Sequence, residues 1–195
     1  MSEALPPVGL LAGAGRPPLL VARGVRRAGR KLVVVGLAQV ASPRLAGLAD
    51  AFVWAPLARI GVWTRALRRH GVREAVLIGA VNKSRIYSPL RVLRYIPDLR
   101  TARLWYSTLR KDKRDTAVLR GIADELRRGG VEVISSVHYC QEHLAHEGLM
   151  TRSRPPRAAA GDIDFAWRIA RQSAALDIGQ SLAVKERDII AIEAM

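Results

Sequence analysis

Two segments in the first half of the chain carry residues that could bind a phosphate. Gly13 and Gly15 follow one apolar run, and Asn82, Lys83 and Arg85 follow another. Glycines let backbone amides approach an anion, arginine binds a phosphate in a fork, and lysine acts as a point charge. These residues indicate a pyrophosphate site. Two plainer interpretations stay open: a simple strand-to-helix turn at the glycines, which lack the third glycine of the dinucleotide fingerprint, and a solvated basic loop at 82–85.

The elements that would hold both segments alternate between strands and helices. Apolar runs predict strands at 8–12, 31–36, 52–54, 74–79 and 131–134. Helices are predicted from the turn after the first strand to residue 25, over 59–70, and over 115–128. This alternation favours a parallel sheet covered on both faces, which is a Rossmann-like α/β arrangement. Ligands of such sheets bind beyond the carboxyl ends of the strands, where both segments would lie.

The stretch 88–110 is rich in Leu, Arg, Tyr and Trp and is predicted to form helices broken at Pro97. Its apolar stripe with flanking arginines suits contact with acyl chains and membrane, and packing within the protein is the alternative. The next predicted helix opens at Asp115, whose carboxylate is placed to cap it. Arg127 and Arg128 suit the dipole at the other end of that helix.

Composition limits the class of protein. With 195 residues, 49% of them hydrophobic, the chain can bury a full core. No run approaches the roughly 18–20 apolar residues of a membrane span, and no secretory signal opens the chain, so we expect residence in the cytoplasm. The net charge of +15 favours phosphate-rich partners, whether nucleic acid, anionic lipid or nucleotide. The charge is scattered, and no recognition helix, RNA-binding aromatic motif or zinc finger is recognisable, which disfavours nucleic acid.

Cys140 is the single cysteine of the chain, so no internal disulfide can form. His138, His143 and His146 lie close to it in sequence. Their spacing matches none of the common structural zinc patterns. We therefore interpret this stretch as the end of a half-buried strand followed by a polar helix start.

A proline- and arginine-rich connector at 151–161 divides a first domain, 1–150, from a second segment, 162–195. In the second segment, apolar residues at helical spacing are followed by two short apolar runs around the turn Glu186-Arg187, which predicts a helix leading into a hairpin. A lone hairpin is marginal in water, and an apolar edge such as 189–193 invites association with another chain. We expect sheet partners from sequence beyond residue 195, with a homo-oligomer as a further expectation.

The second segment resembles the start of the C-terminal domain of the LpxI family, the UDP-2,3-diacylglucosamine pyrophosphatases of lipid A biosynthesis. The matching motifs are Ala166-Trp-Arg168, Leu176-Asp-Ile-Gly-Gln180, Val184-Lys185 and Ala191-Ile-Glu-Ala194. Earlier in the chain, the family's glycine-rich opening and its Gly-x-Val-x-Lys/Arg loop are similar to Gly9–Pro18 and Gly79–Lys83. The resemblance thus implies an α/β fold: a Rossmann-like domain followed by an incomplete α+β C-terminal domain.

The resemblance also implies a reaction, the hydrolysis of the pyrophosphate bond of UDP-2,3-diacylglucosamine to UMP and 2,3-diacylglucosamine 1-phosphate. A divalent metal, Mg²⁺ or Mn²⁺, would offset charge on the phosphates. Residues at the family's motif positions, and so candidates for the site, are Gly13, Gly15, Asn82, Lys83, Asp115, Asp177, Gln180 and Glu193, and Arg85 is a further candidate because of its charge beside Lys83. Asp115 is the candidate catalytic carboxylate, and the metal ligands stay unassigned. The aspartate on which the family's hydrolysis depends is expected beyond residue 195, so we expect this chain alone to bind poorly and turn over little.

Three other expectations accompany this one. The basic charge favours peripheral contact with the anionic inner membrane, which would help an enzyme that acts on a lipid nucleotide. A catalytically silent nucleotide-binding module is the first alternative function. A basic nucleic-acid-binding protein is the second, and its affinity would fall steeply with salt.

Overall fold

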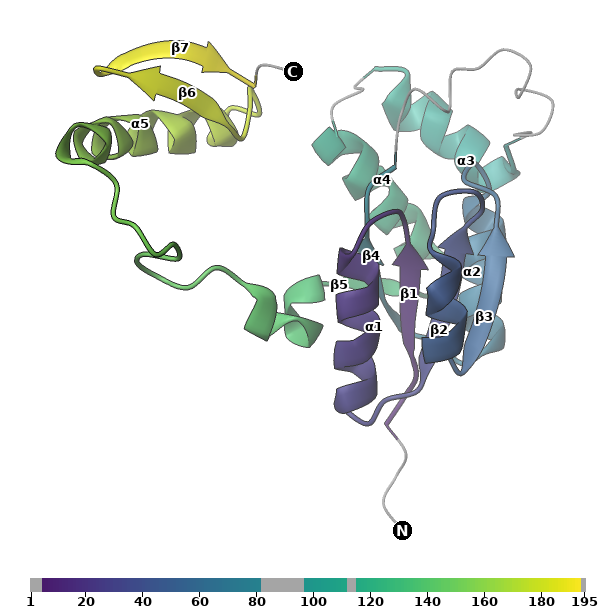
Figure 1. Cartoon of the computed structure of the whole chain (residues 1–195). Helices are drawn as coiled ribbons and strands as arrows, with labels where there is room; N and C mark the ends of the chain where they lie inside the picture. The colour runs from purple at the N-terminus through teal and green to yellow at the C-terminus, as the bar shows by residue number, and fades with distance from the viewer. Residues whose placement is uncertain (1–4, 82–96, 112–114, 194–195) are drawn as a thin grey trace. The chain divides into compact units, whose positions relative to one another are not determined.

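The computed structural model of the chain describes residues 5–81, 97–111 and 115–193, and shows two compact units, Met1–Leu144 and Ala145–Met195 (Figure 1). The first unit contains a five-stranded sheet. Its strands are β1 (Val8–Ala12), β2 (Leu32–Leu37), β3 (Ala51–Ala55), β4 (Glu74–Ile78) and β5 (Glu132–Ile134). Every pairing in this sheet is parallel, in the order β3-β2-β1-β4-β5. The predicted α/β class with a Rossmann-like sheet is confirmed.

The central strands are buried on both faces, which is why they are nearly continuous apolar runs. Leu10 of β1 pairs with Val34 of β2 and Val76 of β4, and all three belong to one core. Helix α1 (Pro17–Arg27) and the 3₁₀ helix η1 (Pro43–Leu48) cover that core. Because strand side chains alternate between faces, neighbouring residues such as Leu11 and Val35 enter a second core.

The second core is covered by α2 (Ile60–Arg69), α3 (Leu99–Leu104) and α4 (Asp115–Arg128). Trp63 and Leu67 of α2 pack there with Leu126 of α4. A π-helical turn, η4 (Trp105–Leu109), continues α3, and the helices predicted before Pro97 lie outside the described residues. After β5, two short 3₁₀ helices follow, η5 (Ser136–Tyr139) and η6 (Gln141–His143).

Glycine at position 24 lets η5 approach α1 closely. A Cβ built on Gly24 would lie 1.7 Å from the carbonyl oxygen of Tyr139. We expect Gly24→Ala to lower the free energy of unfolding by about 1–3 kcal/mol, because η5 must move away. Urea unfolding measures this change. In Gly47→Ala, where nothing lies within 4 Å of the added Cβ, the change should stay within about 0.5 kcal/mol; equal losses in the two variants would contradict the packing argument.

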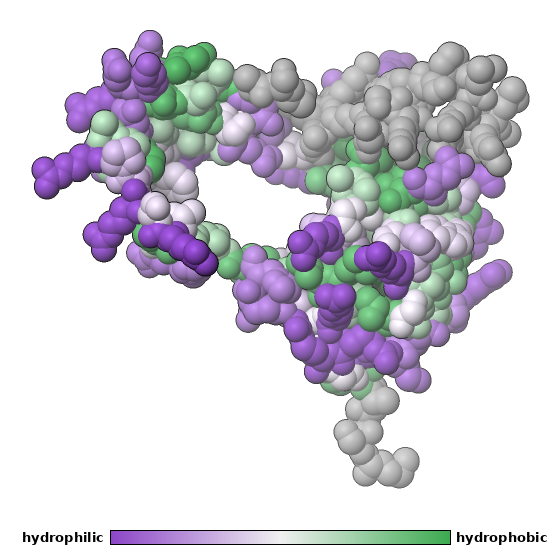
Figure 2. Space-filling view, viewed as in Figure 1, coloured by the Kyte–Doolittle hydropathy of each residue, from purple (hydrophilic) through white to green (hydrophobic). Residues whose placement is uncertain are grey.

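In the second unit, α5 (Arg157–Ala175) precedes an antiparallel hairpin of β6 (Leu182–Lys185) and β7 (Asp188–Ile192), as predicted. Helix α5 begins within the segment predicted as connector, because Pro156 can precede a helix and the alanines after Arg157 are strong helix formers. Figure 2 shows hydrophobic surface over the hairpin, where Ile190 is 65% exposed. Association of this edge with another chain stays a prediction.

The hairpin turn contains two residues that rarely adopt its backbone conformation. Glu186 and Arg187 both have positive φ, +54° and +62°, a two-residue conformation that usually requires Asn-Gly. The carboxylate of Asp162 on α5 accepts hydrogen bonds from both of their amides, at 3.0 and 2.8 Å. The helix therefore holds the turn that joins the two strands.

Candidate functional site at the carboxyl edge of the sheet

The carboxyl ends of β1 and β4 meet where the strand order of the sheet reverses. In the sheet, β2 and β3 lie on one side of β1, whereas β4 and β5 lie on the other side. Beyond the strands, Ala14 and Ala80 form an isolated bridge, each donating its amide to the carbonyl of the other, at 2.8 and 3.0 Å. Ligands of open α/β sheets bind at such a reversal point.

Two glycines make this close approach sterically feasible. A Cβ at Gly13 would lie 2.8 Å from the carbonyl oxygens of Gly79 and Ala80. A Cβ at Gly79 would lie 2.7 Å from the carbonyl carbon of Gly13, and Gly79 also has a φ of +106°. Gly15 has a φ of +99°, which turns the chain toward α1. The structure thus places Gly13 and Gly15 at the edge where the sequence predicts them.

Helix α1 begins beside this edge but offers few backbone donors. Its first two residues are Pro17 and Pro18, which have no N–H. The amide of Leu19 already donates to the carbonyl of Arg16, at 3.0 Å. Arg16 is exposed at the N-cap and shares a pocket of about 310 Å³ with Arg23 and Arg44. A phosphate near α1 would therefore meet guanidinium groups more than the amides of the helix.

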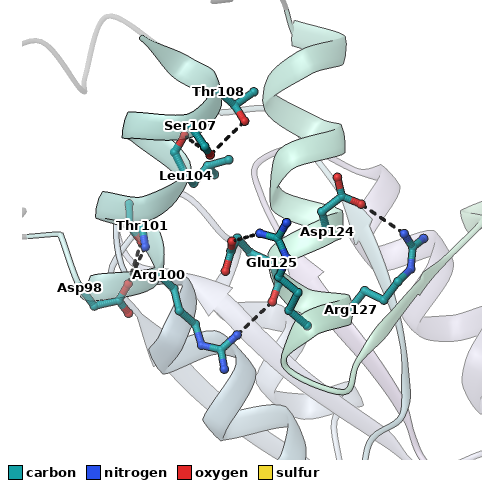
Figure 3. A network of polar contacts seen from close by, with 10 residues as sticks. Asp98, Arg100, Thr101, Leu104, Ser107, Thr108, Asp124, Glu125 and Arg127 are labelled. Atoms are coloured by element: carbon teal, nitrogen blue, oxygen red, sulfur yellow. Dashed lines mark hydrogen bonds and ion pairs between the residues drawn. The ribbon is translucent and has the colours of Figure 1, made fainter. Parts of the chain in front are cut away.

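The other helix that begins near this edge, α2, is closed to anions by the protein itself. The carboxylate of Asp98 accepts a hydrogen bond from the amide of Gly61, at 2.7 Å, and the hydroxyl of Thr101 accepts one from Ile60, at 3.1 Å. Asp98 also accepts from the amide and the hydroxyl of Thr101, both at 2.9 Å (Figure 3). One carboxylate caps α2 and α3 together, so the first amides of α2 have internal partners.

Only some of the remaining predicted site residues lie within the described part of the chain. Asn82, Lys83 and Arg85 lie outside the described residues, directly after Val81. Asp115 is the first residue of α4. Nothing in the structure assigns a role to any of the predicted site residues, so their roles stay predictions.

Asp177 and Gln180 lie in the second unit, in the segment between α5 and β6. Asp177 has a φ of +59°, at the end of the helix. The backbone amide of Gln180 donates a hydrogen bond to the carboxylate of Glu193, at 2.8 Å. The same carboxylate accepts from the amide and the hydroxyl of Ser181, each at 3.2 Å. The motif Leu176–Gln180 is thus tied by Glu193 to the end of the hairpin, a contact that no sequence pattern indicates.

The amides of Gln180 and Ser181, with the Ser181 hydroxyl, hold the pKa of Glu193 below its ordinary value. A lowered carboxylate pKa means that the unfolded chain binds the proton more tightly. This contact therefore stabilises the second unit above the ordinary glutamate pKa, and its contribution is lost as the pH falls through the lower, folded value.

We expect the NMR signals of the Gln180 and Ser181 amides to titrate with a midpoint below the ordinary glutamate pKa of about 4.3. Glu193→Gln should abolish that titration, whereas Glu186→Gln, in the exposed turn, should preserve it. A midpoint at or above the ordinary value would contradict the hydrogen-bonding arrangement.

Two kinds of feature are absent from the described part of the chain. Over 5–81, 97–111 and 115–193, no group of three or more His, Cys, Asp or Glu side chains is placed to hold a metal ion. Within the same ranges, no helix is long and apolar enough to cross a membrane.

The strand order and the glycine-lined reversal point define a Rossmann-like α/β domain. The model of the LpxI N-terminal domain matches residues 7–143, and that of the LpxI C-terminal domain matches 146–195. The chain belongs to the LpxI family. It is 30% identical, over 190 residues, to the UDP-2,3-diacylglucosamine pyrophosphatase LpxI of Caulobacter vibrioides. That match covers 96% of this chain and 64% of the relative, so the chain spans less than two thirds of the relative's length.

Two solved structures are also similar to the chain. One is the UDP-glucose-4-epimerase of Stenotrophomonas maltophila with bound NAD and formylated UDP-arabinopyranose, with a TM-score of 0.41 and 13% identity over 88% of this chain and 49% of that one. The other is gox2253, with a TM-score of 0.42 and 15% identity over 89% and 49% of the two chains. Scores this low carry no conclusion about function.

Proposed function

We propose that the protein hydrolyses the pyrophosphate bond of UDP-2,3-diacylglucosamine, giving UMP and 2,3-diacylglucosamine 1-phosphate in lipid A biosynthesis. The observation that carries the proposal is the match of both LpxI domain models, in order, along the chain. The name of the Caulobacter vibrioides relative, a UDP-2,3-diacylglucosamine pyrophosphatase, supplies the substrate. The glycine-lined edge of the first unit supports it, because ligands of open α/β sheets bind where the strand order reverses.

In this proposal, Gly13 and Gly15 bring the backbone close to the pyrophosphate. Arg16 beside them, with Lys83 and Arg85 of the loop that follows Val81, offsets its negative charge. Asp177 and Gln180, of the second unit, are further proposed substrate-binding residues on the strength of the family resemblance. Water attacks one phosphorus, the bond from that phosphorus to the bridging oxygen breaks, and the two monophosphates separate. These cations would stabilise the negative charge that develops on the phosphate oxygens in this step.

Asp115 is the proposed catalytic carboxylate, and Mg²⁺ or Mn²⁺ the proposed cofactor, on the strength of the family resemblance. The described residues do not bring together three side chains that could hold such an ion. We therefore assign it no ligands and route no step through it.

We also propose that the protein resides in the cytoplasm and contacts the inner membrane peripherally. The net charge of +15 favours an anionic surface. Leu99, Trp105 and Tyr106, on α3 and η4, are 91%, 51% and 71% exposed, and exposed apolar and aromatic side chains are typical of lipid-facing segments.

The second candidate function is a catalytically silent nucleotide-binding module. The glycine-lined edge suits this function as well, since binding a nucleotide there requires no hydrolytic chemistry. The two functions differ in one experiment: incubation with UDP-2,3-diacylglucosamine and Mg²⁺ or Mn²⁺, with UMP and the lipid phosphate quantified. Release of both products in equal amounts supports hydrolysis. Binding of added UMP, measured by equilibrium dialysis, without release of either product from the substrate supports the silent module.

A further inference from the structure

A groove of about 870 Å³ runs along α2, between it, the start of α3 and the end of α4. We call it the arginine groove. Its lining residues are Gly61, Thr64, Arg65, Arg68, Arg69, Pro97, Asp98, Leu99, Arg100, Ala102 and Gly129. None of the residues of the Ala14–Ala80 edge lines it. It is therefore a separate concavity, and its volume lies within the range of about 300–1,000 Å³ that small-molecule sites occupy.

The groove contains four guanidinium groups whose charge the described carboxylates do not neutralise. Some arginines elsewhere in the first unit are paired, as in Arg26–Asp50, Arg30–Glu74 and Arg127–Glu132. Between residues that the structure describes, no ion pair involves Arg65, Arg68, Arg69 or Arg100. Asp98 also lines the groove and carries one negative charge, so the four guanidinium groups outnumber the carboxylates of the lining by three.

Three of these side chains are held in place by backbone carbonyls rather than by carboxylates. Arg100 donates to the carbonyl of Glu125, at 3.1 Å, as Figure 3 shows. Arg68 donates to Gly129 and Arg65 to Gly61, each at 3.3 Å. A guanidinium has five N–H donors, so each retains others for a ligand. Their positions are thus fixed while their charge stays available.

Two glycines in the lining bring the walls of the groove close together. A Cβ at Gly129 would lie 2.2 Å from Cγ2 of Thr64 and 3.2 Å from a terminal nitrogen of Arg100. A Cβ at Gly61 would lie 2.7 Å from Oδ2 of Asp98. A side chain at either position would force these walls apart, so the close spacing of α2, α3 and α4 around the arginines depends on glycine.

We propose that the arginine groove binds the phosphate group of an anionic ligand, at a site additional to the one that the proposed function uses. Arginine binds phosphate in a planar fork, and several unneutralised cations in a concavity focus positive potential on an entering anion. Two sources supply this chemistry: a soluble polyphosphate and the headgroup of an anionic lipid. Leu99, 91% exposed at the rim, is the kind of apolar neighbour that a lipid headgroup site would have.

The test compares two double variants with the same net charge. Arg65→Gln with Arg69→Gln removes two cations from the groove. Arg73→Gln with Arg152→Gln removes two exposed arginines that do not line it. Binding of inorganic pyrophosphate is measured by equilibrium dialysis, and binding of vesicles by co-sedimentation, with phosphatidylglycerol–phosphatidylcholine vesicles against phosphatidylcholine alone. Any pyrophosphate bound at the carboxyl edge of the sheet contributes equally to both variants.

We expect the groove variant to lose about tenfold or more in affinity for at least one probe, because each guanidinium removed takes charge-assisted hydrogen bonds away from the bound anion. The matched variant should stay within about twofold of the native protein. A selective loss for pyrophosphate identifies a soluble ligand, and a selective loss for the anionic vesicles identifies a lipid headgroup. Equal losses in the two variants, or no loss in either, would overturn the proposal, since the effect would then be one of overall charge.

Discussion

Gly79→Ala is expected to lower the free energy of unfolding of the first unit by about 2–5 kcal/mol. Two costs combine at this position. The added Cβ would lie 2.7 Å from the carbonyl carbon of Gly13, which is backbone and cannot rotate away. The φ of +106° is also a conformation that an L side chain rarely adopts. Because relief of the clash separates Ala14 from Ala80, we expect UMP binding to weaken by more than tenfold.

The control for this variant is Gly29→Ala, which separates the two costs. Gly29 also has a positive φ, +68°, but nothing lies within 4 Å of the added Cβ. Gly29→Ala should lower the free energy of unfolding only by the conformational cost of the positive φ, about 1–2 kcal/mol, and should leave UMP binding unchanged. Urea unfolding and equilibrium dialysis with UMP measure both effects. If Gly79→Ala were no more destabilising than Gly29→Ala, the close approach of β1 and β4 beyond the sheet would be refuted.

Asp98→Ala is expected to destabilise the first unit by about 2–3 kcal/mol, the second large effect. The carboxylate accepts hydrogen bonds from the amides of Gly61 and Thr101, and so caps α2 and α3 at once. Loss of a single helix cap costs about 0.5–2 kcal/mol, and here two caps are lost together. The amide of Gly61 would also lose its partner in a part-buried position.

Thermal and urea unfolding check this prediction, with Asp98→Asn as the matched variant. Asparagine retains one acceptor oxygen, so Asp98→Asn should lower the free energy of unfolding by less than Asp98→Ala does. Asp124, an exposed residue of α4 that pairs with Arg127, provides the comparison. Asp124→Ala should change stability by less than about 1 kcal/mol, because exposed ion pairs contribute little. A cost for Asp98→Ala as small as that for Asp124→Ala would show that Asp98 does not cap both helices.

The strands of the first unit could be predicted because their burial requires a recognisable pattern of apolar residues. The run predicted at 8–12 is β1, and those at 31–36 and 74–79 agree with β2 and β4 to within one residue. Buried parallel strands are uninterrupted apolar runs bounded by turn residues, and such runs need no knowledge of the partner strand. The position of Gly13 and Gly15 follows from the same logic, because they come directly after a predicted strand.

Contacts between elements distant in sequence could not be predicted. Asp98 caps α3 locally, and only the packing of α3 against α2 brings it to Gly61. Asp162 lies within α5, far in sequence from Glu186 and Arg187, yet its carboxylate supports the turn that they form. The arginine groove is similar, since Arg65 and Arg100 become neighbours of one cavity through tertiary structure alone.

The most direct test of the central claim is UMP release from UDP-2,3-diacylglucosamine by Gly13→Ala, beside the native protein and Gly47→Ala. Each is assayed as the 195-residue chain and as the product of the complete reading frame that contains it, with Mg²⁺ or Mn²⁺, under conditions where all are folded. We predict that the native protein and Gly47→Ala release UMP with equal kcat/KM in at least one form, and that Gly13→Ala loses tenfold or more. UMP release by Gly13→Ala at the native rate, or no release by the native protein in either form, would contradict the account.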